Sequence, residues 1–151
     1  MARKSEPRTV KITSLREYVA WVEELQEAHT QGAQLYAPWF RGVGDAAFDL
    51  VPGLYRREDT CDLTLDLKLR REFRRMGNQL TPGGAGLNHW EWYFLMQHYR
   101  MPTRLLDWTD GALFALYFAL SSAVPNKKPC VWALNPWTLN RLSTGAATVY
   151  R

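Results

Sequence analysis

The sequence predicts an α+β fold, in which a small mixed or antiparallel sheet is flanked by three or four helices. Segments with apolar residues at helical spacing alternate along the chain with shorter aromatic or apolar runs bounded by glycine and proline. The length of 151 residues fits a single domain. A hydrophobic content of 46%, with seven Trp, seven Tyr and six Phe, is sufficient for one packed core.

Two helices are predicted by capping boxes, in which a side chain at each end satisfies a backbone donor of the first turn. Ser14 and Glu17 form the capping box of a helix at about Leu15–Ala28, and Asn88 and Glu91 mark the start of another. The predicted buried stripes are Leu15, Tyr18, Val19, Val22 and Leu25 in the first helix and Trp92, Tyr93, Leu95, Met96 and Tyr99 in the second.

A third helix is predicted over Asp62–Met76. The alternating leucines would also suit a strand, but the segment is long and consists mainly of Leu, Lys, Arg and Glu, which favour a helix. It is the most basic part of the chain. A basic helix can bind nucleic acid, although the interspersed acids favour a solvated face. The basic residues in question are Arg70, Arg71, Arg74 and Arg75.

Two strands are expected. Leu35–Gly42 is rich in aromatic residues and follows a glycine, and Pro38 places it at a sheet edge or a bulge. Cys130–Leu134 is a compact apolar run that suits an interior strand. One further helical turn is predicted at Trp137–Leu142.

Arg41 is a candidate binding residue in the first of these strands. Gly42 and Gly44 follow it and allow a backbone or a ligand to approach closely. An arginine in this setting suits a phosphate or a flat ring. The alternative is that Arg41 forms an ion pair with Asp45 or Asp49.

The densest group of polar side chains lies in Gln97–Thr109, between two apolar helical segments. Such a rigid hinge is a common place for a binding or catalytic site. The alternative is structural: Arg104 and Asp107 would form an ion pair that fixes the loop, and Thr109 would only cap a helix. The candidate residues are His98, Thr103, Arg104, Asp107 and Thr109.

Around this segment, Pro102 should end the preceding helix. Thr103–Trp108 is then predicted to be extended, and Thr109 or Asp110 to cap the next helix. That helix, Ala112–Ser121, is apolar nearly all round, so we expect it to be internal.

The chain is mildly basic, with 19 Lys and Arg against 15 Asp and Glu. This balance suits an anionic partner, such as a nucleotide or a nucleic acid, without requiring one. Cys61 and Cys130 belong to no metal-binding pattern, so no metal is expected. The charged start resembles no secretory signal, and Ala112–Leu120 is too short to span a bilayer, so we expect a cytoplasmic protein with no membrane partner.

Several blocks of the sequence resemble one family. Trp39–Gly42 is similar to the aromatic-Arg-Gly signature for which the FRG domain is named, a domain found mainly in bacterial and phage proteins. Gln97–Thr109 followed by Ala115–Ala119 resembles the longest block of that family, and Val131–Pro136 its later strand. The similarity runs from about residue 13 to residue 140.

The resemblance implies an FRG domain over residues 13–151, preceded by a disordered tail at residues 1–12. One position departs from the pattern. The family usually has glycine where Arg100 stands, so this arginine alters the turn before Pro102 and adds a charge near the expected site.

A weaker resemblance is to ADP-ribosyltransferases, which use NAD as a substrate. In those enzymes an aromatic-Arg-Gly strand is followed by a segment with hydroxyl residues and a helix like Ala115–Ala119. The resemblance implies that Arg41 contacts phosphate or ribose and that Thr109 braces the nicotinamide end. On this basis the catalytic candidates are His98, Asp107 and Thr109, and the cofactor-binding candidates are Arg41, Gly42, Gln97, Thr103 and Arg104.

The implied reaction cleaves the nicotinamide glycosidic bond through an oxocarbenium-like state, which requires a carboxylate. In the transferases this carboxylate comes from a later strand. Here no acid follows Asp110, so Asp107 or Glu91 would have to substitute. We therefore expect that the domain lacks a C-terminal part or has lost catalysis.

These considerations favour a ligand- or partner-binding module with a pocket formed by Arg41 and the 97–109 segment. A protein partner or a missing C-terminal domain would complete it. The first alternative is an ADP-ribosyltransferase-like toxin or phage-defence effector. The second is a nucleic-acid-binding protein, or a nuclease in which His98 and Asp107 form the metal or acid–base pair.

Overall fold

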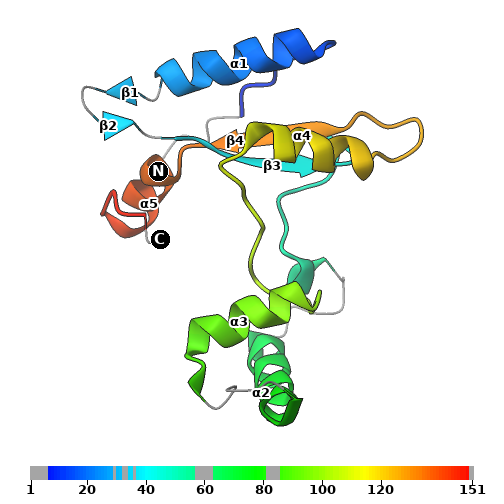
Figure 1. The fold of residues 1–151 in the computed structure, drawn as a ribbon, viewed down its shortest axis with the longest axis vertical. Coiled ribbons are helices and arrows are strands. Elements are labelled where there is room, and N and C mark those ends of the chain that lie inside the picture. The colour runs from blue at the N-terminus through cyan, green and yellow to red at the C-terminus, as the bar shows by residue number, and fades with distance from the viewer. Residues whose placement is uncertain are drawn as a thin grey trace. The chain divides into compact units, whose positions relative to one another are not determined.

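The computed structural model describes residues 7–28, 30–31, 34–35, 37–56, 63–80 and 86–149 (Figure 1). The chain divides into two compact units. The first unit comprises Met1–Asp45 and Trp108–Arg151, and the second unit is Ala46–Asp107. The predicted tail at residues 1–12 lies partly outside the described residues, and residues 7–12 have no regular secondary structure.

The described residues of the first unit form two separate two-stranded antiparallel sheets and three of the helices. Its elements are α1 (Leu15–Ala28), β1 (Thr30–Gln31), β2 (Gln34–Leu35), β3 (Trp39–Val43), α4 (Ala112–Ser121), β4 (Cys130–Leu134) and α5 (Pro136–Thr144). The second unit contains a 3-10 turn η1 (Gly53–Tyr55) and the helices α2 (Leu63–Leu80) and α3 (His89–His98). Together these elements confirm the predicted α+β class.

Strands β3 and β4 pair in an antiparallel register that runs from Trp39 opposite Leu134 to Val43 opposite Cys130. The bounds of β4 are those predicted from the sequence. The first strand is different: the predicted run Leu35–Gly42 is divided into β2, which pairs with β1, and β3. Pro38 lies between them, where its missing N–H donor costs no ladder hydrogen bond.

Helix α4 packs closely on β3, as Figure 1 shows. The close approach depends on Gly42 and Gly44. A Cβ atom on Gly42 would lie 2.5 Å from the backbone nitrogen of Ala119, and one on Gly44 would collide with the backbone of Ser122. The space that these glycines leave open is therefore occupied by the helix backbone.

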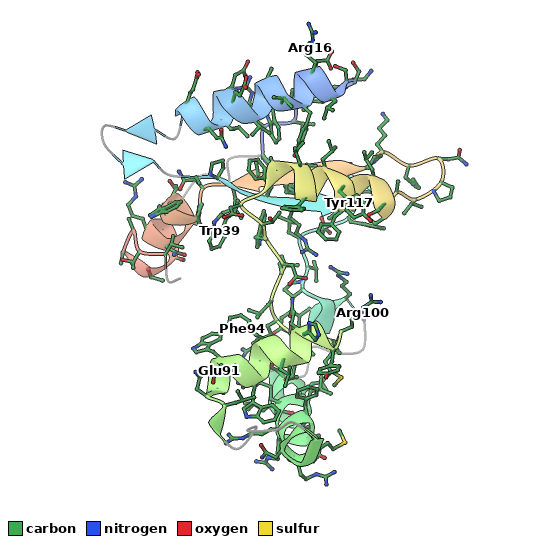
Figure 2. All side chains as sticks on the ribbon, in the orientation of Figure 1. Arg16, Trp39, Glu91, Phe94, Arg100 and Tyr117 are labelled. Atoms are coloured by element: carbon green, nitrogen blue, oxygen red, sulfur yellow. The ribbon has the colours of Figure 1, made fainter. Side chains whose placement is uncertain are left out.

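The expectation that α4 is internal is wrong for most of its surface. Only Ala115 and Ala119 are buried, and they belong to the side that packs on β3. Large apolar residues cover the rest of the helix. Those with exposed side chains are Leu113, Phe114, Tyr117, Phe118 and Leu120, of which Tyr117 is labelled in Figure 2.

The capping box before α3 is confirmed. The Asn88 side chain accepts from the backbone of Trp90 and Glu91, and the Glu91 carboxylate accepts from the Asn88 N–H at 2.6 Å. At the start of α1, the Ser14 hydroxyl accepts from the Glu17 N–H, and the Glu17 carboxylate accepts from the Thr13 N–H at 2.6 Å. Hydrogen bonds from the backbone and side chain of Thr13, with a smaller contribution from the backbone of Ser14, lower the pKa of Glu17.

The buried stripes of these two helices are narrower than predicted. In α1 only Tyr18 is fully buried, and Leu15 and Val19 are exposed. In α3 the predicted Trp92, Tyr93 and Met96 are buried, whereas Tyr99, just past the helix end, is exposed.

Helices α2 and α3 pack together in the second unit. Phe73 meets Trp92 edge to face, with ring centroids 6.1 Å apart. One turn further along α2, a Cβ atom on Gly77 would lie only 2.6 Å from the Trp92 ring, so this position accommodates the indole. The helix predicted over Asp62–Met76 is thus confirmed as α2. Within the described residues, no helix is long and apolar enough to cross a membrane.

Candidate functional site

The segment that joins α3 to the first unit begins with a tight turn. Arg100 has φ of 58°, a left-handed conformation that side chains other than glycine adopt infrequently. The Met101 N–H donates to the Met96 carbonyl oxygen at 3.0 Å, which closes the turn before Pro102. The helix ends here as predicted. Thr103–Trp108, predicted to be extended, pairs with no strand among the described segments.

A buried carboxylate, Asp66 of α2, organises the second unit. Its side chain is inside the unit, with only 2% of the residue exposed. The Tyr93 hydroxyl donates to Oδ1 at 2.8 Å. On the other oxygen, Oδ2, Arg104 forms an ion pair at 2.7 Å and Arg70 one at 3.3 Å. A buried charge is tolerated only with such partners, and here one acid has three.

Arg104 is held from two directions. Its guanidinium pairs with Asp66, while its backbone N–H donates to the Tyr93 hydroxyl at 3.0 Å. The contact with Tyr93 and the negative charge of Asp66 raise the pKa of Arg104 above its ordinary value, so the side chain stays charged. Nevertheless 49% of the side chain is exposed. Arg104 therefore presents a fixed cation to solvent.

The ion pair expected from the sequence was between Arg104 and Asp107. The partner of Arg104 is instead Asp66, which is 38 positions away in the chain. A signal for it exists in the sequence: Asp66 precedes Phe73 by seven residues, so it lies on the apolar stripe of its helix, where an acid needs a partner. Arg70 extends the cluster, with its Nη1 atom 2.6 Å from Nε2 of His89.

Gln97, Thr103 and Asp107 form a second connected group. The Thr103 hydroxyl donates to the Gln97 side-chain oxygen and accepts from the Leu105 N–H at 3.2 Å. The Gln97 amide donates to the Asp107 carboxylate at 2.5 Å. Thr103 is buried, whereas Asp107 is exposed. Gln97 and Thr103 thus determine the shape of the loop, and Asp107 is the member of the group that reaches the surface.

His98 is the last residue of α3 and is exposed. Its ring meets that of Tyr99 edge to face at 5.4 Å. Arg100 follows on the same exposed corner and is labelled in Figure 2. The end of α3 accordingly presents two polar side chains, one aromatic and one cationic.

In the first unit, Thr109 lies beside β3. Its backbone exchanges two hydrogen bonds with Phe40, at 2.7 and 2.9 Å. The N-cap of α4 is Gly111, so the prediction that Thr109 or Asp110 caps this helix is wrong. The Thr109 hydroxyl accepts from the Gly111 N–H at 3.0 Å instead, which shapes the approach to the helix. Arg41 follows Phe40, is half-buried, and is opposite Trp132 of β4.

The two units divide the predicted site residues between them. The first unit holds Arg41, Gly42 and Thr109, and the second holds Gln97, His98, Thr103, Arg104 and Asp107. The single pocket that the sequence predicts for them stays a prediction, as does a cofactor contact at Gly42. Among the described residues, no three His, Cys, Asp or Glu side chains are grouped to hold a metal ion.

Comparison with known proteins identifies one family. The model of the FRG domain matches residues 37–128, a range that includes β3, the second unit, α4 and the turn before β4. Comparison with curated proteins found no match, and comparison with solved structures found none. The family match covers more than half of the sequence and includes Trp39–Gly42 and the block from Gln97 to Ala119, whereas the later strand Val131–Pro136 lies outside it. The chain belongs to the FRG family.

Proposed function

We propose that this FRG-family chain is a ligand-binding module, and that its second unit binds an anionic group of a nucleotide-like ligand through Arg104. The observation that carries the proposal is the way Arg104 is held. Its guanidinium is fixed by the buried Asp66 at 2.7 Å, yet half of the side chain is open to solvent.

Fixing an arginine in advance favours binding for two reasons. The side chain loses less rotational freedom when the ligand arrives, because the ion pair with Asp66 already restrains it. The guanidinium has five N–H donors in a planar fork, so the ion pair with Asp66 leaves donors for a second anion. Phosphate and carboxylate groups match this fork in geometry and charge.

A second polar group on the same segment of the chain suits a ligand that also carries hydroxyl groups. Asp107 at the surface can accept from a hydroxyl, such as that of a ribose, while Gln97 holds the carboxylate in place. Arg41 in the first unit remains the residue that the resemblance to ADP-ribosyltransferases assigns to a dinucleotide. We propose NAD and ADP-ribose as the first ligands to test.

The experiment is isothermal titration of the full chain with NAD, ADP-ribose and inorganic pyrophosphate. We expect Arg104→Ala to weaken binding by roughly 10- to 100-fold, because a hydrogen bond to a charged group is lost. Arg104→Lys should recover only part of the affinity, since an ammonium lacks the planar fork. Arg41→Ala is measured in parallel as a separate test of the first unit.

The matched control is Arg56→Ala, an exposed arginine of the same unit whose Nε donates to the Val51 carbonyl oxygen. It should leave the affinity unchanged. Two results would contradict the proposal: none of the three ligands binds, or Arg104→Ala and Arg56→Ala weaken binding equally. In the second case Arg104 would serve only to fix the loop.

A further inference from the structure

We infer that the exposed face of α2 binds the phosphate backbone of a nucleic acid. This outer face of α2 is a stripe of residues spaced three or four apart along the helix, all of them exposed: Thr64, Lys68, Arg71, Arg75 and Asn78.

Packing within the second unit determines which side of α2 faces outward. Asp66, Phe73 and Gly77 contact α3 through Tyr93 and Trp92. Because 3.6 residues make one turn, the outer face of α2 lies on the opposite side of the helix from these three residues. The side chains of the stripe are therefore directed away from the core of the unit.

The sequence alone favoured a solvated face because acids are interspersed among the basic residues. The structure weakens this objection. Asp66 is buried and already serves Arg70 and Arg104, so it contributes no surface charge to the outer face. The remaining acid, Glu72, pairs with Arg75 at 3.0 Å, with 54% and 65% of the side chains exposed, and such a surface pair is weak.

Arg71 of the outer face and Arg74 beside it are both exposed, and within the described part of the chain no ion pair involves either arginine. Every member of the outer face has a side chain that can donate a hydrogen bond, and none is acidic. The stripe runs from Thr64 to Asn78, which is 14 residue steps, or about 21 Å at the rise of an α-helix. A surface that is long, cationic and rich in donors matches a row of phosphates better than a single small anion.

The test measures binding of the full chain to a labelled 20-base-pair duplex of mixed sequence, as DNA and as RNA, by fluorescence anisotropy. We expect the duplexes to bind, and the logarithm of the association constant to fall linearly with the logarithm of the salt concentration. The slope should have a magnitude of about 2–4, since each phosphate contact contributes about 0.9. The DNA and RNA duplexes then show which backbone is preferred.

The variant Arg71→Glu/Arg75→Glu should lower affinity at least roughly 10-fold and reduce the slope by about 2. Both positions are exposed and glutamate is a good helix former, so the circular dichroism spectrum should be unchanged. The matched control is Arg16→Glu/Arg141→Glu in the first unit, which alters the net charge equally at two exposed arginines, of which Arg16 is labelled in Figure 2.

Three outcomes would overturn the inference. The duplexes fail to bind at 50 mM salt, the control variant loses as much affinity as the α2 variant, or poly-glutamate of equal charge competes as well as unlabelled duplex. The inference rests on the outer face of α2 alone, and not on the nucleotide ligand proposed above.

Discussion

At the scale of single residues, Asp66 shows how one buried acid can organise a unit. It holds an arginine of its own helix, Arg70, and Arg104 from the segment after α3, and it accepts a hydrogen bond from Tyr93. Since both cations depend on one carboxylate, changes at these positions should not be additive in their effect on stability.

Arg100 adopts a backbone conformation that is costly for a residue with a Cβ atom, at φ of 58°. We expect Arg100→Gly to stabilise the protein by roughly 0.5–1 kcal/mol, because relief of the left-handed penalty exceeds the added entropy of glycine in the unfolded chain. The free energy of unfolding in urea measures this. Arg100→Ala keeps the Cβ atom and should give little change, so an equal gain in both variants would refute the explanation.

Tyr18 should make the stability of the first unit sensitive to alkaline pH. Its hydroxyl donates to the Ala112 carbonyl oxygen at 2.6 Å, and burial raises its pKa from 10.0 to about 12. A raised pKa means that folding favours the neutral phenol. This contribution is complete below pH 10 and is lost as the pH rises through 12.

The measurement compares the urea midpoints of the wild-type protein and Tyr18→Phe between pH 8 and 12. Phenylalanine cannot ionise, so the wild-type midpoint should fall relative to that of the variant above pH 10. Parallel curves across this range would show that ionisation of Tyr18 is not coupled to unfolding.

At the scale of elements, the contact between α4 and β3 depends on the absence of a side chain at Gly42. We expect Gly42→Ala to destabilise the protein by roughly 2–3 kcal/mol, because the added methyl group meets the backbone of Ala115 and Ala119 rather than a movable side chain. Thermal unfolding measures the effect. Gly86→Ala is the control, since a Cβ atom there has no neighbour within 4 Å. Similar melting temperatures for the two variants would contradict this packing.

The elements that sequence predicts well are those encoded locally. The capping box of Asn88 and Glu91 contains its own start signal, and the apolar run Cys130–Leu134 coincides with β4. The exposure of α4 was not predictable in this way. An apolar sequence predicts that a helix is buried, but it does not say which residues are buried. In α4 the buried residues are Ala115 and Ala119.

The candidate site was less predictable than the fold for the same reason. The polar residues of Gln97–Thr109 are evident in the sequence, and the bonds among Gln97, Thr103 and Asp107 are short-range in the chain. The partner of Arg104 is not evident in the sequence. Asp66 belongs to another helix, and pairing across such a separation depends on how α2 packs.

At the scale of the whole molecule, the second unit is inserted into the first. The chain leaves the first unit after Asp45 and returns at Trp108. On return, Thr109 pairs at once with Phe40, from which it is separated by the whole of the second unit. The FRG match at residues 37–128 includes this insertion and both chain segments that flank it.

The pairing of β3 with β4 has a consequence for co-translational folding. Strand β3 is synthesised early, but its partner β4 emerges about 90 residues later, after the entire second unit. The second unit is continuous in sequence and so can fold first. Until β4 is synthesised, β3 has an unpaired edge that can pair with strands of other chains. Pausing of translation after residue 107 would lengthen that interval, and chaperones that shield nascent strands would act at this stage.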